Sequence, residues 1–473
     1  MTAQTTVLSE EAVTAVSDLT VTYSDGRRAL RSVSLAVNPG ETVAVIGESG
    51  CGKSTLIKAL LGLLPADASV DGSIRIDGCD VTTASEAQLR EIRGSRVGYV
   101  AQDAYGGLDP LMRIGANIEE AWRSKSRPVP RGAAAQRLAA LDVADSARRV
   151  RDWPHTWSGG MQQRAGIAAA TALGPALVVA DEPTSALDTG TAETVLTRLV
   201  AESRSLLIVS HDLPLVAKFA DRIYVLQDGR IVEHGDAERI LTAPRDPYTL
   251  ALIRAHDPLV DAPGTAPVGE VVLDVEAVGH RYGTRQVVPT TSLQVRRGEI
   301  LGIRGPSGSG KSTLLRILAG LERAGSGTVT WSGAPAPASG SVQLVFQDAV
   351  GSLDPRWPIW KSVVEPVRLR GARGRAAATS ALHRLGLETV PLQARPSALS
   401  GGQCQRVALA RALVSGARLV LADEPTAALD PTVGRQVLEA LRDLADSGTA
   451  VVMVSHDDRA LESVCDRILT LGQ

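Results

Sequence analysis

Five short motifs occur twice in this 473-residue chain, in the same order each time. The first copy reads GESGCGKST, QDAYGGLDP, SGGMQQR, ADEPTSALD and VSHD, and these motifs begin at Gly47, Gln102, Ser158, Ala180 and Val209. The second copy reads GPSGSGKST, QDAVGSLDP, SGGQCQR, ADEPTAALD and VSHD, beginning at Gly305, Gln347, Ser400, Ala422 and Val454. Background composition gives one GxxxxGK[ST] match in roughly a few per cent of chains this long. Two matches, each followed by the same four motifs, therefore indicate a duplicated domain.

A Pro-, Gly- and Ala-rich stretch without periodicity, LVDAPGTAPVGE, divides the two copies and is typical of a linker. We therefore expect a first domain over residues 1–258, a linker over 259–270 and a second domain over 271–473. In both copies short apolar segments alternate with helical patterns, which predicts an α/β core with a mainly parallel sheet. The second copy is shorter, since Lys53 and Lys311 are 258 positions apart but Glu182 and Glu424 only 242.

Charge and cysteine content narrow the functional classes. With 50 Lys and Arg against 52 Asp and Glu, the chain has no general attraction for nucleic acid or anionic lipid, although a local basic patch remains open. The four cysteines form no CxxC pair and fit no zinc or iron–sulfur spacing, which favours a reducing compartment. The first residues resemble no secretory signal, and no apolar run reaches the roughly 18 residues of a membrane span. If the protein works at a membrane, we expect a partner to recruit it.

Each GxxxxGKS segment lies between a strand pattern, such as Thr42–Ile46, and a helical pattern, such as Thr55–Leu64. That context is the one a phosphate-binding loop requires, because glycines let backbone N–H groups surround phosphate oxygens at a helix N-terminus. The alternative, a glycine-rich turn with an exposed lysine, is disfavoured by the repeat. The expected phosphate-binding residues are Gly47, Gly50, Gly52, Lys53, Ser54 and Thr55, and Gly305, Gly308, Gly310, Lys311, Ser312 and Thr313.

Two acids end the apolar strand pattern of each ADEP motif. Carboxylates at a strand tip can simply be solvated, but a pair beside a phosphate loop favours catalysis. We expect Asp181 and Asp423 to hold Mg²⁺, and Glu182 and Glu424 to orient or deprotonate the attacking water.

Polar residues also follow the other strand patterns. A lone histidine at a strand end is usually structural, but His211 and His456 occupy the same place in both copies, which favours a role at the γ-phosphate. Gln102 and Gln347 follow the strand patterns Val97–Ala101 and Val342–Phe346, and each can contact Mg²⁺ or water.

The remaining candidates are a glycine pair and a tyrosine. Ser158 and Gly160, like Ser400 and Gly402, precede helical stretches and offer a second phosphate site, which is redundant unless it serves the other domain's nucleotide. Tyr23 and Tyr282 end the first strand pattern of each copy and are suited to stack on adenine, with core packing as the alternative.

Together these motifs resemble the ATP-binding-cassette superfamily over almost the whole chain. The resemblance implies two tandem P-loop cassettes, each with a RecA-like mainly parallel sheet, an antiparallel β subdomain and a helical signature subdomain. It also implies two composite ATP–Mg²⁺ sites between cassettes that face head to tail. Site one would combine Tyr23, Lys53, Ser54, Gln102, Asp181, Glu182 and His211 with Ser400 and Gly402. Site two would combine Tyr282, Lys311, Ser312, Gln347, Asp423, Glu424 and His456 with Ser158 and Gly160.

One departure distinguishes the two halves. The usual LSGGQ signature reads Trp157-Ser-Gly-Gly-Met161 in the first half. Ser158 and Gly160 are retained, so we expect both sites to hydrolyse ATP, with the rate of site two altered.

Two further elements, GGLDP/GSLDP and Asp246-Pro-Tyr-Thr249, resemble segments of the oligopeptide, dipeptide and nickel uptake ATPases. Two departures count against that match. Ala104 and Ala349 stand where those ATPases usually have proline, directly after the Gln-Asp pair. The cysteine-containing segment that often follows their HPYT segment, the counterpart of Asp246–Thr249, is missing, so no iron–sulfur cluster is expected. The resemblance implies a peripheral ATPase on the cytoplasmic face of the cell membrane. Its expected partners are two integral membrane permeases and an extracytoplasmic solute-binding protein, with no nucleic acid. Energy-coupling-factor vitamin or metal uptake and, less so, a ribosomal or DNA-repair ATPase remain alternatives, and peptide, nickel, metal chelate and small glycoconjugate remain open as cargo.

Overall fold

The computed structural model describes residues 12–48, 50–184, 189–255, 259, 269–306, 308–427 and 429–471. The chain divides into two compact units, Met1–Arg254 and Ala255–Gln473, and each is considered by itself. The expected linker, 259–270, lies mostly outside the described residues.

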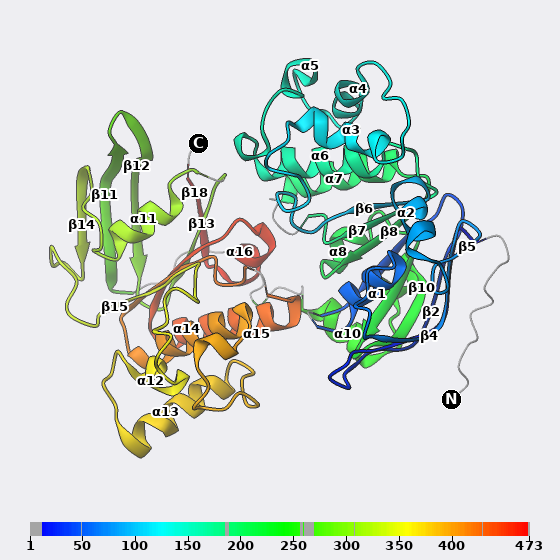
Figure 1. The fold of residues 1–473 in the computed structure, drawn as a ribbon. Helices are drawn as coiled ribbons and strands as arrows, with labels where there is room; N and C mark the ends of the chain where they lie inside the picture. Colours follow the sequence, from blue (N-terminus) through cyan, green and yellow to red (C-terminus); the bar gives the residue numbers. More distant parts are fainter. Residues whose placement is uncertain are drawn as a thin grey trace. The chain divides into compact units, whose positions relative to one another are not determined.

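Unit 1 contains two sheets (Figure 1). The antiparallel sheet has the order β2-β1-β4-β5. Its strands are β1 (Thr14–Thr22), β2 (Arg28–Val37), β4 (Ser69–Ile76) and β5 (Cys79–Asp80). The second sheet has the order β10-β9-β3-β8-β7-β6, in which only β10 runs antiparallel to its neighbour. Its strands are β3 (Thr42–Ile46), β6 (Val97–Val100), β7 (Leu177–Asp181), β8 (Leu206–Ser210), β9 (Arg222–Gln227) and β10 (Arg230–Asp236).

The central strands of this second sheet are short, and both of their faces are covered. Every residue of β3, β7 and β8 is buried, as continuous apolar strands in parallel sheets usually are. Val43 and Val45 pack with the antiparallel sheet and α1, whereas Ala44 and Ile46 pack in the core formed with the other helices. Alternate residues of one strand thus join two different cores.

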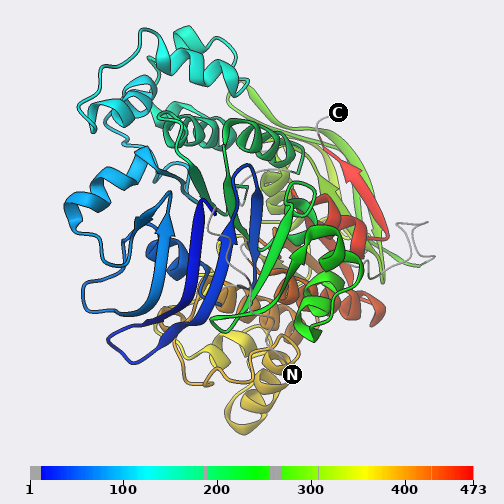
Figure 2. The same cartoon turned by 90° about the vertical axis from the view of Figure 1, so that its right-hand side faces the viewer.

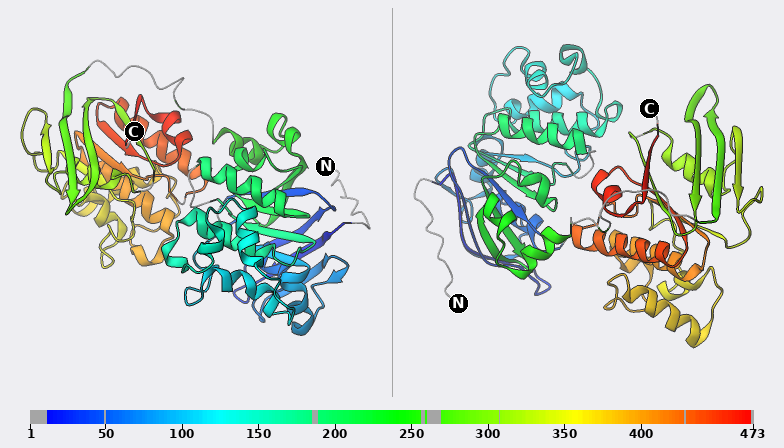
Figure 3. Two further views of the ribbon diagram at one scale, coloured as in Figure 1. Left: turned by 90° about the horizontal axis from the view of Figure 1, so that it is seen from above. Right: turned by 180° about the vertical axis from the view of Figure 1, so that it is seen from behind.

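The helices of unit 1 fall into two groups. Those that flank the sheets are α1 (Lys53–Leu60), α2 (Glu86–Ser95), α6 (Gly159–Ala170), α7 (Thr189–Glu202), α8 (Leu213–Val216), α9 (Ala237–Thr242) and α10 (Pro247–Arg254). A separate helical layer contains α3 (Ile114–Arg123), α4 (Ala133–Ala140), α5 (Ser146–Arg149) and the 3-10 turn Pro154–Thr156. This layer stands at one end of the unit, beside α6 (Figures 1, 2 and 3).

Unit 2 repeats this plan. Its antiparallel sheet is β12-β11-β14 and its parallel sheet is β15-β16-β17-β13-β18. The strands are β11 (Val271–Tyr282), β12 (Arg285–Arg296), β13 (Ile300–Arg304), β14 (Ser326–Trp331), β15 (Val342–Val345), β16 (Leu419–Asp423), β17 (Ala450–Val454) and β18 (Arg467–Thr470). The helices are α11 (Lys311–Leu318), α12 (Ile359–Val364), α13 (Gly371–His383), α14 (Gly401–Ser415), α15 (Pro431–Asp446) and α16 (Asp458–Val464), with a 3-10 turn at Pro396–Ala398.

Between the phosphate-loop lysine and the paired acids, most of the length difference between the copies lies in one connection. In unit 1 the chain forms β5 and α2 between β4 and β6, whereas the corresponding connection in unit 2, residues 332–341, contains no helix or strand. The α/β prediction with a mainly parallel sheet in each copy is confirmed. The strand predicted over Thr42–Ile46 has those bounds, but the helix predicted over Thr55–Leu64 runs from Lys53 to Leu60. Within the described residues, no helix has the length and apolarity needed to cross a bilayer.

A buried carboxylate fixes the end of unit 1. Glu233 on β10 accepts hydrogen bonds from the backbone N–H groups of Arg245 and Asp246, at 3.0 Å each, and pairs with Arg239 at 3.0 Å. Burial by itself would raise the pKa of Glu233, but these donors outweigh it and lower the pKa below its usual value. The carboxylate therefore holds the start of α10 against β10.

We expect Glu233→Gln to destabilise unit 1 by about 1–3 kcal/mol at neutral pH, because charged hydrogen bonds are lost. Since the folded pKa is depressed, the stabilising effect is present above the unfolded pKa and is lost as pH falls through the folded pKa. Thermal melts of the variant and the parent should therefore converge in acid. Glu238→Gln, at an exposed position on α9, is the control, and an equal loss in both variants would contradict this account.

Candidate nucleotide-binding sites

The first glycine-rich loop connects β3 to α1 and is closed by its own lysine. Lys53 Nζ donates to the carbonyl oxygens of Gly47 and Glu48, at 2.5 Å and 2.9 Å. Gly52 has φ 114°, and a Cβ there would lie 2.6 Å from Ala29 O, so the turn excludes a side chain. Gly50 also has positive φ, at 85°. The loop thus presents backbone N–H groups and a buried ammonium at a helix N-terminus, which suits a polyphosphate.

The second loop has the same construction. Lys311 Nζ donates to Gly305 O at 2.7 Å and to Pro306 O at 3.0 Å. Gly310 has φ 93°, and a Cβ there would lie 2.1 Å from Val287 O. Thr55 and Thr313 lie buried in the first turn of α1 and α11, whereas Ser54 is exposed.

A tyrosine from α10 holds the first loop from outside. The backbone N–H of Glu48 donates to Tyr248 Oη at 3.0 Å, while the carbonyl of the same residue accepts from Lys53. In the second loop Pro306 occupies the position of Glu48 and has no N–H to donate. The DPYT segment was noted in the sequence, but this contact was not foreseen, because it joins residues 200 positions apart.

The paired acids lie at the carboxyl ends of β7 and β16, and each glutamate contacts the histidine of the neighbouring strand. His211 Nδ1 lies 2.7 Å from Glu182 Oε2, and His456 Nδ1 lies 2.9 Å from Glu424 Oε2. Both glutamates have positive φ, 44° and 51°, which is unusual for residues other than glycine. Backbone bonds from each glutamate N–H to the adjacent strand, to Val209 O and Val454 O, hold this conformation.

Each contact alters the acidity of its histidine. Burial of the His211 ring opposes protonation, but the hydrogen bond and charge of Glu182 outweigh it and raise the pKa of His211. For His456, the hydrogen bond to Glu424 is the largest cause of the raised pKa. Each Glu–His pair therefore behaves as one charge-coupled unit beside its phosphate loop.

The aspartates are suited to a cation. Burial, followed by the charge of Glu182, raises the pKa of Asp181 to about 6, and a cation bound beside it would favour the ionised carboxylate. Among the described residues, Asp423 Oδ1 is buried without a hydrogen-bond partner. In unit 2, Ser312, Gln347 and Asp423 line one cavity of about 400 Å³. A hydroxyl, an amide oxygen and a carboxylate form an all-oxygen donor set, which is the kind that Mg²⁺ takes.

The two predicted aromatic residues lie in different surroundings. Tyr23 is half-buried, its hydroxyl lies 3.1 Å from Thr55 Oγ1, and the Arg27 guanidinium lies over its ring at 4.9 Å. Tyr282 is 51% exposed and donates to Glu322 at 2.6 Å, so it is no core residue. Gln102, like Gln347, is exposed at the end of its strand.

The SGG segments form helix N-termini that differ in their side-chain capping. Ser400 caps α14, accepting from Gln403 N, while Gln403 Oε1 accepts from Ser400 N. Ser158 precedes α6 without a side-chain cap bond, and Met161, which corresponds to Gln403, has no amide oxygen to accept from the N–H of Ser158. Gly160 and Gly402 lie in the first turn of these helices. The expected pairing of each segment with the other unit's nucleotide concerns the placement of the two units, which the structure does not define.

We expect Tyr248→Phe to raise the apparent KM for ATP about two- to tenfold, because one net hydrogen bond to the first loop is lost. Glu48→Pro deletes the same bond from the other side and copies the second loop. A double-mutant cycle tests this, with the KM for ATP measured by steady-state ATPase assays of the parent, both single variants and the double variant. The double variant should be no worse than either single one, and fully additive effects would contradict a shared bond.

Known proteins share these features. The ABC transporter family model matches the chain twice, over residues 30–185 and 288–427. The peptidoglycan transport ATP-binding protein YejF of Agrobacterium fabrum is 34% identical, with 96% of this chain and 90% of that protein covered. The glutathione import ATP-binding protein GsiA of Salmonella choleraesuis is 33% identical, with 98% and 86% covered.

A solved structure shares the fold. The archaeal ribosome recycling factor aABCE1, in complex with the ribosomal stalk protein aP1, aligns with a TM-score of 0.69, covering 96% of this chain and 87% of that one. At 23% identity this likeness bears on the fold alone. The two family matches, and relatives one-third identical along nearly the whole chain, show that the protein belongs to the ABC transporter family, as a two-cassette ATPase that uses ATP and Mg²⁺.

Proposed function

We propose that this chain is the energy-coupling ATPase of an ABC importer for peptides or related small solutes. The observation that carries the proposal is the length of the likeness to ATP-binding proteins named for glutathione import and peptidoglycan transport. The alignments run through both cassettes and cover 98% and 96% of this chain. The GGLDP, GSLDP and DPYT segments favour the same group, whereas the names of the two relatives given above do not include nickel.

In this proposal each phosphate loop holds the triphosphate of one ATP, with the adenine against Tyr23 or Tyr282. Lys53 and Lys311 exchange their backbone carbonyl partners for the β- and γ-phosphate oxygens. Mg²⁺, when bound, neutralises phosphate charge, and Ser54, Gln102 and Asp181 or Ser312, Gln347 and Asp423 would hold it. Glu182 and Glu424 orient the attacking water and accept its proton, while His211 and His456 hold those carboxylates in place.

We further propose that each SGG segment closes over the nucleotide of the other cassette. Ser400 and Gly402 would complete site one, and Ser158 and Gly160 would complete site two, each offering a helix N-terminus to the γ-phosphate. The capping box around Ser400 fixes its hydroxyl before nucleotide arrives. Met161 provides no such restraint to Ser158, so the two closures should differ in rate.

The surface formed by the segments that follow Gln102 and Gln347 suits a membrane partner. Tyr105, Leu111 and Val350 expose 44%, 84% and 52% of their surfaces in these segments. Apolar side chains exposed close in sequence to these glutamines suit the docking of a permease loop. We propose that the chain works with two integral membrane permeases and an extracytoplasmic solute-binding protein. It would lie peripherally on the cytoplasmic face of the cell membrane. A vitamin or metal uptake module of the energy-coupling-factor type is the alternative within transport.

We expect Glu182→Gln and Glu424→Gln, made separately, each to lower ATP turnover by the share that its own site contributes, and the double variant to lose at least about 99% of turnover. Loss of a general base slows its own site about 10²–10⁴-fold, and two working sites share the total rate. Steady-state phosphate release from the purified chain measures this. Glu276→Gln, an exposed change on β11, is the control. A glutamate whose removal leaves turnover unchanged belongs to a silent site.

Co-purification followed by uptake tests the transport proposal. The chain, expressed with permeases encoded beside it, should be retained with them and should drive ATP-dependent uptake of labelled muropeptide, dipeptide or glutathione into vesicles. Glu182→Gln with Glu424→Gln should abolish that uptake. Sedimentation of the chain with ribosomes, or uptake of nickel or a vitamin alone, would contradict the proposal.

A further inference from the structure

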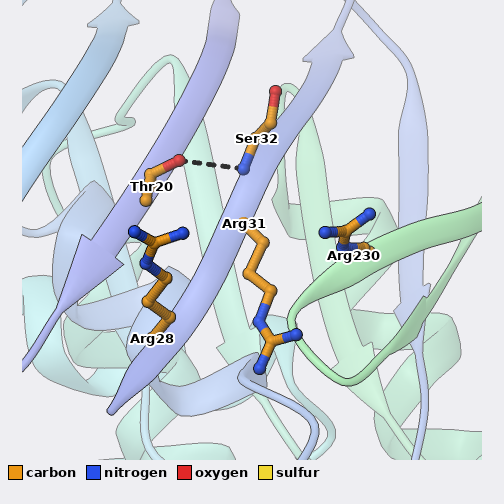
Figure 4. A pocket seen from close by; sticks show the side chains of 5 residues that line it. All are labelled: Thr20, Arg28, Arg31, Ser32 and Arg230. Carbon is orange, nitrogen blue, oxygen red and sulfur yellow. Dashed lines mark hydrogen bonds between the residues drawn. The ribbon is translucent and has the colours of Figure 1, made fainter. Parts of the chain in front are cut away.

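Three arginines surround a depression on the antiparallel sheet of unit 1. Its lining residues are Thr20, Arg28, Arg31, Ser32 and Arg230, which we call the arginine pocket (Figure 4). Its volume is about 450 Å³. The net charge of −2 gives no sign of it, because the arginines come from two segments about 200 residues apart.

A break in strand alternation brings Arg28 and Arg31 to one face. Residues three apart on a regular strand point to opposite faces, yet both arginines are exposed. The β1–β2 register shifts between the Val21–Leu30 and Thr22–Arg28 pairs, within the segment that joins the two arginines. It shifts again between the Leu19–Val33 and Val21–Leu30 pairs, where Ser32 has φ 53° and forms a second bulge. The N–H of Ser32 donates to Thr20 Oγ1 at 3.0 Å, which fixes the bulge (Figure 4).

A second strand adds the third arginine. The N–H of Arg31 donates to Gly229 O at 2.8 Å. Arg230 is the next residue of the chain, so this bond holds the start of β10 beside Arg31. Gly229 has φ 78°, and a Cβ there would lie 2.6 Å from Ala29 O, so the turn packs tightly on β2. The backbone that carries the three side chains is therefore held in place before any ligand binds.

The positive charges of the pocket are not neutralised within the described structure. None of the three guanidinium groups forms a hydrogen bond or ion pair there, although Arg27 and Arg222 nearby pair with Asp25 and Glu41. The lining residue Ser32 donates its hydroxyl to the carboxylate of Asp18 at 2.9 Å, and no such bond joins Asp18 to an arginine of the pocket. Three like charges around one depression repel each other, and a bound anion would relieve this repulsion.

We propose that the arginine pocket binds an anion bearing phosphate groups. A guanidinium group offers paired donors that match phosphate oxygens, and three of them favour two or more negative charges on the ligand. A soluble phosphate compound and a lipid phosphate headgroup share this chemistry.

The pocket is separate from the ATP site of the same unit. Leu19 and Val21 are buried in the core with α1, and Tyr23 contacts Thr55 there, whereas Thr20 alternates with them toward the other face. The second cassette lacks the two arginines of β2. Counted from the Gly-Glu pairs that precede β3 and β13, Arg28 and Arg31 correspond to Gln286 and Pro289.

Calorimetry on the full chain tests the proposal, with both phosphate loops filled by ADP in magnesium-free buffer and pyrophosphate as probe. Flotation with phosphatidylcholine vesicles, with and without phosphatidic acid, is the lipid arm. The pocket variant carries Arg28→Gln, Arg31→Gln and Arg230→Gln. The control variant loses the same charge from exposed positions of unit 1, through Arg75→Gln, Arg148→Gln and Arg151→Gln.

The parent and the control variant should bind pyrophosphate, and the pocket variant should bind at least tenfold more weakly. Binding only to phosphatidic acid vesicles, lost in the pocket variant alone, would identify the lipid source and also support the site. Unchanged melting temperature and ATP turnover show that the pocket variant folds. Equal binding by both variants, or no binding of either probe by the parent, would overturn the proposal.

Discussion

The chemistry of each cassette depends on the carboxyl ends of a few parallel strands that lie side by side. The phosphate loop follows β3, the histidine follows β8, the acids end β7 and the glutamine follows β6, and these strands are consecutive in the sheet. Because parallel strands end at the same edge, motifs up to 160 residues apart meet there. The left-handed conformation at Glu182 and Glu424 completes the arrangement, with each carboxylate on the histidine of the next strand.

The same plan leaves the two cassettes unequal in how they support their loops. The first loop is held by Tyr248 from the end of its own unit, while Pro306 makes that contact impossible in the second. Conversely, the second signature helix has a complete capping box, and the first has methionine where the box needs glutamine. In the proposed pairing, site one combines the tethered loop with the capped signature, and site two has neither. The differences would then add up in one site instead of cancelling, which makes site one the better preorganised of the two.

Sequence reasoning found what repeats and missed what depends on tertiary contact. The buried strands were predictable because four or five apolar residues followed by a polar motif have few other uses, and β3 and β8 begin where the pattern begins. The start of α1 at Lys53 was missed by two residues, since helical periodicity begins later than the glycine that turns the chain. The Tyr248 contact, the positive φ of the glutamates and the bulge at Ser32 leave no periodic signal. Each of these is set by a neighbour that is distant in sequence.

The arginine pocket extends this point to electrostatics. Net charge is an average over the chain, and ion pairs neutralise only some of its arginines locally, as Arg198 with Asp142 and Arg384 with Asp443 illustrate. What distinguishes Arg28, Arg31 and Arg230 is that all three line one depression without an acidic partner in the described structure, together with a bulge that turns two of them to one face. A solvated surface arginine needs no such backbone. Because the bulge and the Gly229 turn fix where the charges lie, the pocket has the character of a site and not of an incidental patch.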